Sequence, residues 1–161
     1  MKFLSSMDTS ASALTAQRLR MDIIANNLAN VNTTRSGNVD AEGNVLPYRR
    51  QTALFAARPA HEAASFATTL TKAEERLTAP GAGVRVVGIV EDQKPFKMVY
   101  DPDHPDAIRE GPEAGYVRMP NVNTVTEMVD MISATRAYEA NITAINSAKT
   151  LAMKALEIGR G

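Results

Sequence analysis

Hydrophobic residues near the C-terminus recur in alternating steps of three and four, which is the spacing of core positions in a coiled coil. This seam consists of Met128, Met131, Thr135, Tyr138, Ile142, Ile145, Lys149, Ala152 and Leu156. Small residues follow beside it at intervals of seven, and such residues allow a second helix to approach closely. They are, for the most part, alanines: Ala134, Asn141, Ala148 and Ala155. The pattern predicts one long helix from Thr124 to Ile158.

A weaker pattern of the same kind predicts a second long helix near the N-terminus, from Leu4 to Asn30. Its apolar positions fall seven apart, at Met7, Leu14, Met21 and Leu28. Helices of globular proteins usually run ~8 to 20 residues, so both predicted helices are long for one small domain. We therefore expect a coiled-coil-like pairing, either between the two termini or with other chains. An antiparallel helical hairpin buried within a monomer is the alternative.

Helix-breaking residues separate these two ends from the middle of the chain. All eight prolines lie between Pro47 and Pro120. Inside a helix, proline costs ~3 kcal/mol and glycine ~1 kcal/mol relative to alanine. The sequence therefore predicts a mainly α fold with a small β insertion. Its expected parts are an N-terminal helical segment (1–36), an irregular middle segment with a small β-sheet (37–120) and a C-terminal helical segment (121–161).

The middle segment contains short stretches in which apolar and β-branched residues alternate. The stretch GVRVVGIVED, from Gly83 to Asp92, is rich in valine, and a second alternating stretch ends at Tyr100. We expect two strands there, joined as a hairpin near Asp92 to Pro95. A third short strand is expected from Tyr48 to Leu54. Residues 61–77 are helix-prone or form an irregular surface loop.

The tetrapeptide Asn-Val-Asn-Thr occurs twice, at residues 30–33 and again at residues 121–124. In the first copy, Asn30, Asn32 or Ser36 can end the N-terminal helix. Asparagine suits this role because it tolerates the left-handed backbone conformation in which many helices terminate. The first copy therefore predicts a helix end.

The second copy of the tetrapeptide carries a signal for a helix start. Thr124 and Glu127 match a capping box, in which each side chain bonds a free backbone N–H of the first turn. Capping alone accounts for this copy, because asparagine and threonine side chains satisfy exposed backbone groups at either end of a helix.

Asparagines also cluster in the last turns of the predicted N-terminal helix. Asn26, Asn27 and Asn30 are neighbours on the helix surface, and asparagine is only a middling helix former. A polar ladder beside an apolar seam is expected where a helix packs on several others and its register must be specified. Chance clustering is the alternative.

Composition and charge exclude several classes of function. The chain has 161 residues, of which 44% are hydrophobic. No apolar stretch approaches the ~18 residues of a membrane span, so we expect a soluble chain without direct membrane insertion. Eighteen basic and eighteen acidic residues balance, which leaves no charge surplus for binding nucleic acid. The first residues lack the apolar core of a secretory signal, so no cleaved signal peptide is expected.

Candidate chemistry is sparse. The stretch DPDHPD, from Asp101 to Asp106, gathers acids around His104, but it lacks the turn glycine and the distal glutamate of an EF-hand loop. The alternative is a proline-fixed turn in which Asp101 and Asp103 bond local backbone N–H groups. The absence of cysteine excludes thiol catalysis and thiolate metal sites. With no catalytic grouping or phosphate loop in the sequence, we expect no enzyme, no cofactor and no metal.

Three long stretches of the chain, taken in order, carry a family resemblance. They are MDIIANNLANVNTTRS with PYRRQTALF after it, GVRVVGIVEDQKPFKMVYDPDHPDA, and GYVRMPNVNTVTEMVDMISATRAYEANITAINSAKTLAMKALEIG. Together they resemble the FlgC family of flagellar basal-body rod proteins, which are proximal rod subunits. The first motif is similar to rod, hook and other flagellar axial proteins in general. The second stretch and the Pro-Asn-Val-Asn entry resemble the FlgC family in particular.

The resemblance implies a structural subunit whose two terminal helices pair as an inner domain. Such subunits stack helically with other rod proteins around a central export channel. The implied partners are copies of the same chain, other rod proteins, the membrane-ring adaptor and the flagellar type III export apparatus. The implied location is the periplasmic rod. Another flagellar axial protein, of rod or hook type, is one alternative, and a soluble helical binding module or chaperone is the other.

The residues expected to mediate assembly come from the two asparagine-rich motifs and from the C-terminal seam. From the motifs they are Asn26, Asn27, Leu28, Asn30, Asn32, Asn121 and Asn123. From the seam they are Met128, Met131, Tyr138, Ile142, Ile145 and Leu156.

Overall fold

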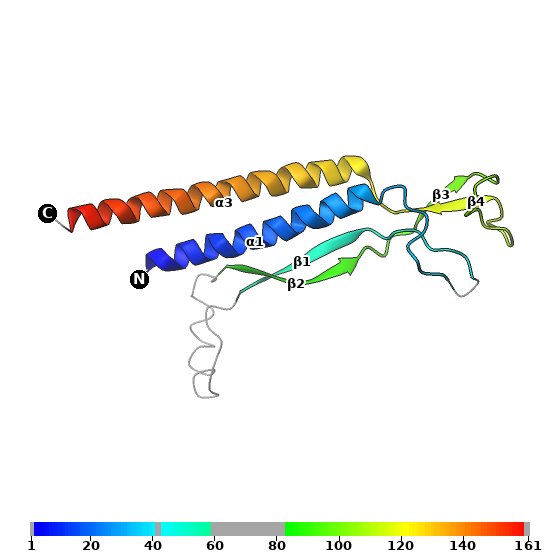
Figure 1. Ribbon diagram of the computed structural model, residues 1–161. Helices are drawn as coiled ribbons and strands as arrows, with labels where there is room; N and C mark the ends of the chain where they lie inside the picture. Colours follow the sequence, from blue (N-terminus) through cyan, green and yellow to red (C-terminus); the bar gives the residue numbers. More distant parts are fainter. Residues whose placement is uncertain (1, 41–42, 59–82, 160–161) are drawn as a thin grey trace, which may run out of the picture. The chain divides into compact units, whose positions relative to one another are not determined.

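A computed structural model describes residues 2–40, 43–58 and 83–159 (Figure 1). Along the chain, four short strands lie between two long helices. The elements are α1 (Lys2–Ala29), β1 (Gln51–Ala57), β2 (Val84–Glu91), β3 (Lys97–Tyr100), β4 (Tyr116–Met119) and α3 (Thr124–Ile158). The described residues therefore have the predicted class, mainly helical with a small β content.

Both helices occupy the segments that the hydrophobic period predicts. Helix α3 has 35 residues and the predicted bounds, whereas α1 ends at Ala29, one residue before the predicted end. Since the helices contain no proline or glycine, the backbone hydrogen bonds continue along each one without interruption. The described strands are short, with eight residues at most.

The strands form two separate two-stranded sheets, β1 with β2 and β3 with β4. The predicted hairpin between β2 and β3 is therefore wrong. At the end of β2, the N–H of Asp92 donates to the carbonyl of Arg50, so this end is held beside the start of β1. The carbonyl of Asp92 accepts from Asn121 and from Arg49. These non-local bonds occupy the residues that a tight turn would need.

The remaining strand predictions are met in part. The strand expected from Tyr48 to Leu54 is present, but β1 begins and ends three residues later. Strand β4 was not predicted, and it pairs antiparallel with β3 so that Tyr100 lies opposite Tyr116. Their rings meet edge to face, with centroids 5.2 Å apart. The prediction for residues 61–77 lies outside the described residues.

The chain divides into two compact units, and each takes part of both helices. The first unit consists of Met1–Leu19, Leu54–Gly88 and Thr135–Gly161. The second unit consists of Arg20–Ala53 and Ile89–Ala134. Within the second unit, the end of α1 and the start of α3 lie side by side (Figure 1).

The buried side chains are concentrated in the second unit. Its buried aliphatic residues are Ile23, Ile24, Ile108, Val117 and Ala134. Two polar side chains, Asn27 and Glu127, are completely buried with them. Among the described residues of the first unit, only the side chain of Ala16 is buried.

One glycine of the first unit permits a close contact between α1 and the start of β2. Gly83 has a positive φ of 114°, and a Cβ there would collide with the hydroxyl of Ser12. That hydroxyl donates to the carbonyl of Thr9 at 2.7 Å and accepts from the N–H of Val84 at 3.1 Å. A glycine is therefore required at this approach.

Candidate functional site

Five polar residues of the second unit converge where α1 ends, β1 begins and α3 starts. We call them the junction cluster: Asn27, Tyr48, Arg50, Asn121 and Glu127. They come from three segments that are far apart in the sequence. The cluster therefore ties the ends of both long helices to the chain that enters the first sheet.

Glu127 is the most unusual member, because a carboxylate is completely buried. Its Oε1 accepts from the Nε of Arg50 at 2.6 Å, and its Oε2 accepts from the Nδ2 of Asn27 at 3.0 Å. A buried charge is strongly unfavourable unless it is paired and hydrogen-bonded. Both oxygens of Glu127 have a partner, and one partner carries the opposite charge.

Asn27 uses its whole hydrogen-bonding capacity inside the chain. Its amide nitrogen donates to Glu127 and to the carbonyl of Gln51, the latter at 2.8 Å. Its amide oxygen accepts from the N–H of Gln51 at 2.9 Å and from the hydroxyl of Tyr48 at 2.8 Å. A primary amide offers two donors and two acceptor positions, so this side chain is fully satisfied. Burial raises the pKa of the Tyr48 hydroxyl, which keeps it a donor.

Arg50 connects the cluster to acidic residues around it. Beyond Glu127, its guanidinium lies 3.5 Å from Asp130 and 3.7 Å from Asp92. Asp130 also pairs with Arg20 of α1 at 2.9 Å. The second unit thus holds the start of α3 to α1 and to β1 through a connected set of charge-assisted bonds.

Asn121 and Asn123, from the second copy of the tetrapeptide, have separate tasks. The amide oxygen of Asn121 accepts from the N–H of Arg50 at 2.8 Å, and its nitrogen donates to the carbonyls of Asp92 and Lys94. Asn123 caps α3, because its side-chain oxygen accepts from two backbone N–H groups of the first turn, at 3.0 and 3.2 Å.

The predicted capping box is therefore wrong. The capping residue is Asn123, one position before Thr124, which places Glu127 in the fourth helical position instead of the third. From there its side chain points into the second unit, towards Asn27 and Arg50. Distant partners, which a local motif cannot include, determine the role of this glutamate.

The first copy of the tetrapeptide ends α1 without a left-handed asparagine. No described residue other than glycine has a positive φ, so the predicted left-handed termination at Asn30, Asn32 or Ser36 is wrong. Instead, the side chain of Asn30 donates back to the carbonyl of Asn26 at 2.9 Å and accepts from Thr33 at 3.0 Å. The carbonyl of Asn26 also accepts from the backbone N–H of Asn30, so both the backbone and the side chain of Asn30 are bound to the last turn.

The remaining predicted motif residues are mostly accessible. Asn26 and Asn32 are exposed, Asn30 and Leu28 are half-buried, and Asn123 is exposed. The amide nitrogen of Asn26 also donates to the hydroxyl of Tyr48 at 3.2 Å. All three asparagines at the end of α1 thus have hydrogen-bond partners within the chain.

The predicted seam of α3 is split between two sides of the helix. Met131, Tyr138 and Ile145 are half-buried, whereas Met128, Ile142 and Leu156 are exposed. The less exposed positions form what we call the inner face of α3: Glu127, Met131, Ala134, Tyr138, Asn141, Ile145, Ala148 and Ala152. The inner face includes three of the four small residues that run beside the predicted seam, whereas the fourth, Ala155, is exposed.

On the opposite side, the start of α3 exposes a short apolar row. We call it the α3 row: Val125, Met128, Val129 and Ile132, which are 54–69% exposed. The same side continues with exposed polar residues, Arg136, Glu139, Thr143 and Ser147. Since each helical residue turns by about 100°, these eight positions share one side of the helix. The apolar character of this side is therefore confined to the first turns.

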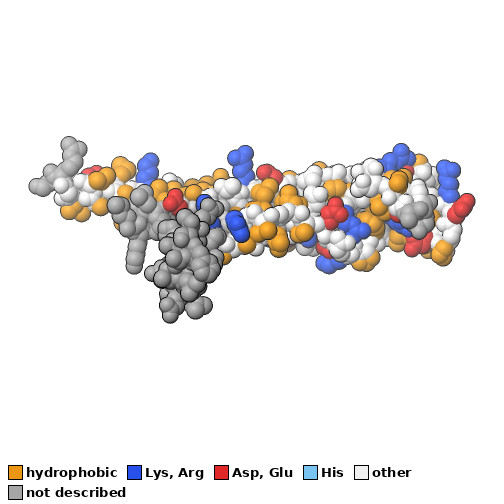
Figure 2. Space-filling model, turned by 90° about the horizontal axis from the view of Figure 1, so that it is seen from below, with side chains coloured by type: hydrophobic (Ala, Val, Ile, Leu, Met, Phe, Trp, Pro, Cys, Tyr) orange, Lys and Arg blue, Asp and Glu red, His pale blue; other side chains and the backbone are white. Residues whose placement is uncertain are grey.

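Apolar side chains are also visible at many other places on the surface (Figure 2). Near the end of α3, Leu151, Met153, Leu156 and Ile158 are 54–82% exposed. Among the described residues, no helix is both long and apolar enough to cross a membrane.

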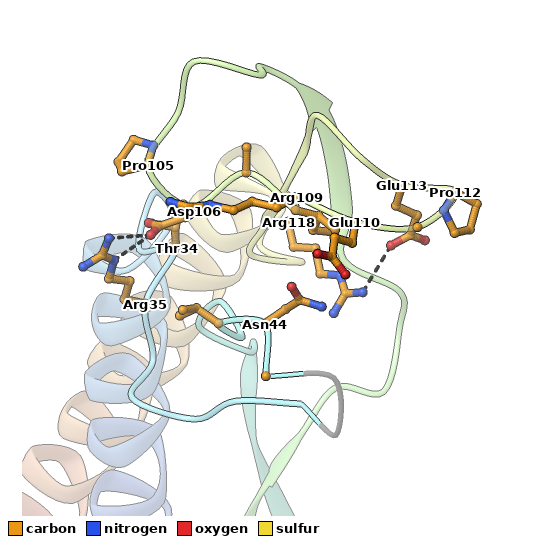
Figure 3. A pocket seen from close by; sticks show the side chains of 15 residues that line it. Thr34, Arg35, Asn44, Pro105, Asp106, Arg109, Glu110, Pro112, Glu113 and Arg118 are labelled. Carbon is orange, nitrogen blue, oxygen red and sulfur yellow. Dashed lines mark hydrogen bonds and ion pairs between the residues drawn. The ribbon is translucent and has the colours of Figure 1, made fainter.

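A separate hollow of about 1090 Å³ lies in the second unit (Figure 3). It is lined by Thr34, Arg35, Asn44, residues 105–113 and Arg118, among others. Two of its arginines, Arg35 and Arg118, are paired with carboxylates. Arg118 bonds Asp40 at 2.6 Å and Glu113 at 3.1 Å, and the hydrogen bond to Asp40 raises the pKa of Arg118.

The acidic stretch from Asp101 to Asp106 borders this hollow. The hydrogen bond from Arg35, at 2.7 Å, and the one from Thr34 hold the pKa of Asp106 below its usual value. The Nδ1 of His104 accepts from the N–H of Asp106 at 3.1 Å. Among the described residues no group of three metal-binding side chains is found. The stretch forms a hydrogen-bonded turn whose last carboxylate is bound by an arginine.

Comparison with known proteins finds families that match the two ends of the chain and individual relatives that match nearly its full length. A family described as "Flagella basal body rod protein" matches residues 7–35. A second, described as "Flagellar basal body rod FlgEFG protein C-terminal", matches residues 113–158. The chain is 47% identical to the flagellar basal-body rod protein FlgC of Bacillus subtilis, over 96% of this chain and 97% of the relative.

Two further relatives carry the same description. The chain is 48% identical to FlgC of Borreliella burgdorferi over the full length of both proteins. It is 35% identical to FlgC of Salmonella typhimurium over 99% of this chain and all of the relative. The junction cluster and the α3 row both lie inside the region that these relatives cover.

Proposed function

The chain belongs to the FlgC family of flagellar basal-body rod proteins, and on this premise we propose how it assembles. It is a structural subunit of the rod, and its function rests on contacts between subunits. We propose that the α3 row docks against a neighbouring rod subunit. The observation that carries this proposal is a row of large apolar side chains, 54–69% exposed, on a helix side that is otherwise polar.

The terminal helices supply the inner part of the assembly in this proposal. Segments 1–36 and 121–161 pair as a coiled-coil-like inner domain, and segment 37–120 lies outside it. Copies stack helically, with other rod proteins, around the export channel. The inner face of α3 supports this arrangement, because its small residues allow close helix packing.

Each class of predicted assembly residue has a place in this scheme. The exposed seam residues Met128, Ile142 and Leu156 contact other subunits directly, and so do the exposed asparagines Asn26 and Asn32. The half-buried seam residues hold the chain's own helices together. Burying exposed apolar area of this kind contributes about 25 cal/mol per Å², from which the entropy cost of association is subtracted.

The wider cellular context follows from the family. We propose that the chain passes through the flagellar type III export apparatus without a cleaved signal peptide and lies in the periplasmic rod. Its partners there are copies of itself, other rod proteins and the membrane-ring adaptor. The function requires no catalysis and no cofactor.

The test replaces one residue of the α3 row by a charged residue. Val129→Asp places a charge in the proposed contact, whereas Ser147→Asp adds the same charge to the polar part of the same helix side. Both positions are exposed, so neither change is expected to shift the thermal unfolding of the purified chain by much. Basal bodies are purified from strains that carry each variant, and the incorporated protein is quantified by blotting.

Val129→Asp is expected to lower incorporation by about tenfold or more, since burying an unpaired charge is strongly unfavourable. Ser147→Asp is expected to assemble as the unmodified chain does. Normal incorporation of Val129→Asp would show that the α3 row is not a contact between subunits.

A further inference from the structure

Helix α3 starts with two apolar sides that compete for the interior of the second unit. The inner side offers Met131 and the small Ala134, and the outer side offers the α3 row with its four large residues. Hydrophobic burial is non-directional and scales with apolar area. Apolar pattern alone would therefore favour packing the α3 row inwards, yet the row lies outside.

The junction cluster distinguishes the two sides. Glu127 lies on the inner side of the turns that carry the α3 row on their outer side. Turning α3 by one residue would present Thr126 or Met128 to Arg50 and Asn27 in place of Glu127. Neither replacement supplies a carboxylate, so the Nε of the half-buried Arg50 and the amide nitrogen of Asn27 would lose the acceptor that they share.

Asn27 makes the cluster sensitive to position as well as to charge. Its remaining bonds go to both backbone groups of Gln51, at 2.8 and 2.9 Å, which fixes α1 against β1. The backbone of Gln51 therefore holds the amide nitrogen of Asn27, which donates to Glu127, in place independently of α3. Only one rotation of α3 satisfies this fixed donor.

We propose that Glu127, together with Asn27 and Arg50, acts as a set of positioning residues that selects which apolar side of α3 packs inside. In doing so it leaves the α3 row facing outwards for a neighbouring subunit. The use of the row in assembly rests on the proposed function. The selection itself is a property of the isolated chain and can be measured there.

The test exploits the absence of cysteine from the chain. Single cysteines are introduced by Val129→Cys, in the α3 row, and by Ala134→Cys, on the inner side where the side chain is fully buried. The rate of alkylation by a small maleimide is measured for each in the purified monomer. The thiol at position 129 is expected to react at least about tenfold faster than the one at position 134, because burial restricts reaction to local opening.

The decisive variant replaces the three charged or amide groups together, by Asn27→Leu, Arg50→Met and Glu127→Leu. Replacing a buried ion pair as a whole by apolar side chains is often neutral or stabilising. The triple variant also removes a partner of Asp92 and the side-chain bonds to the backbone of Gln51, so a cooperative thermal transition is required of it before its rates are compared. We expect the ratio of the two alkylation rates to fall towards one, and incorporation into rods to fall with it. An unchanged ratio would overturn the proposal, because apolar packing would then set the rotation alone.

A matched control separates positioning from general stability. Val117→Ala removes two buried methyl groups from β4, in the same unit but outside the cluster. It is expected to lower the thermal midpoint while preserving the ratio. A ratio that collapses in this control as well would overturn the proposal. A ratio that collapses only in the triple variant, together with normal rods, would support positioning and contradict the docking role of the α3 row.

Discussion

The two units of the chain differ in what holds them together. The second unit buries five aliphatic side chains around a fully bonded carboxylate and amide, whereas the described part of the first unit buries only Ala16. In the first unit, the end of α3 instead exposes large apolar residues, with Leu156 at 71% and Ile158 at 82%. The second unit therefore has a buried centre, whereas the described part of the first unit leaves large apolar side chains exposed.

The difference suits a subunit that needs one defined fold before assembly and exposed apolar surface for contacts during assembly. Polar groups that are buried and paired allow one arrangement, because every alternative leaves a donor or acceptor unsatisfied. Apolar surface without such groups accepts many neighbours. We infer that the second unit determines geometry and that the first unit contributes contact area.

The largest expected effect comes from breaking the second unit at its centre. Glu127→Ala leaves the guanidinium of Arg50 and the amide of Asn27 without their shared acceptor. We expect the free energy of unfolding to fall by about 3 to 5 kcal/mol, as it does when one partner of a buried ion pair is removed. Glu139→Ala, at an exposed position of the same helix, is expected to change it by less than about 0.5 kcal/mol.

Urea unfolding of the two purified variants measures both values. A loss below about 1 kcal/mol for Glu127→Ala would be typical of an exposed ion pair. It would remove the contrast between the two units.

Hydrogen exchange on the monomer sharpens the comparison residue by residue. Amides around Ile23 and Ile24 are expected to exchange only through opening of the second unit, since these side chains are buried there. Amides of α3 beyond Ile145 are expected to exchange about a hundredfold faster, because few buried contacts oppose local fraying. Assembly into rods should slow the second group. Equal protection of both groups in the dilute monomer would contradict a loosely held first unit.

The sequence predicts the helices better than it predicts the strands, for a physical reason. Helix bonds are local, so the apolar period and the absence of breakers specify α3 to its terminal residues. Strand pairing is not local. The stretch VRVVGIVE was recognised as a strand, but its partner is β1 and not the nearer β3. Asn121 bonds Arg50, just before β1, and Asp92 and Lys94 within the expected turn, and such distant contacts are absent from the local pattern.

The candidate site was predicted only in its parts. Asn27 and Asn121 were selected because asparagines cluster around the helix ends, and both are in the junction cluster. Arg50 and Tyr48 were missed, since an arginine and a tyrosine before a strand have no distinctive spacing. Glu127 was noticed for a capping motif that it does not form. A buried charge is defined by its surroundings, and a linear pattern does not contain them.

An intermediate effect on rod assembly is expected when a charge is placed on the part of α3 that belongs to the first unit. Ile142 is 38% exposed and belongs to the predicted seam, whereas Ala140 is exposed and lies off it. Ile142→Asp is expected to block incorporation into rods while the monomer stays folded, and Ala140→Asp is expected to be better tolerated. Blotting of purified basal bodies and of the periplasmic fraction measures both. Equal incorporation of the two variants would show that the adhesive side of α3 lies elsewhere.

The smallest expected effect concerns acid stability at the edge of the second unit. Arg35 donates to Asp106 and holds the pKa of that carboxyl below its usual value of 3.8. A lowered pKa in the folded state stabilises the chain above pH ~4, and this contribution is lost as pH falls through the lowered value. The thermal midpoint of the unmodified chain should therefore exceed that of Asp106→Asn at pH 7, and the two should converge below pH ~4. Asp103→Asn, in the exposed part of the same turn, is the control and should follow the unmodified chain throughout. A difference for Asp106→Asn that persists unchanged to pH 3 would show that the ion pair with Arg35 is not its source.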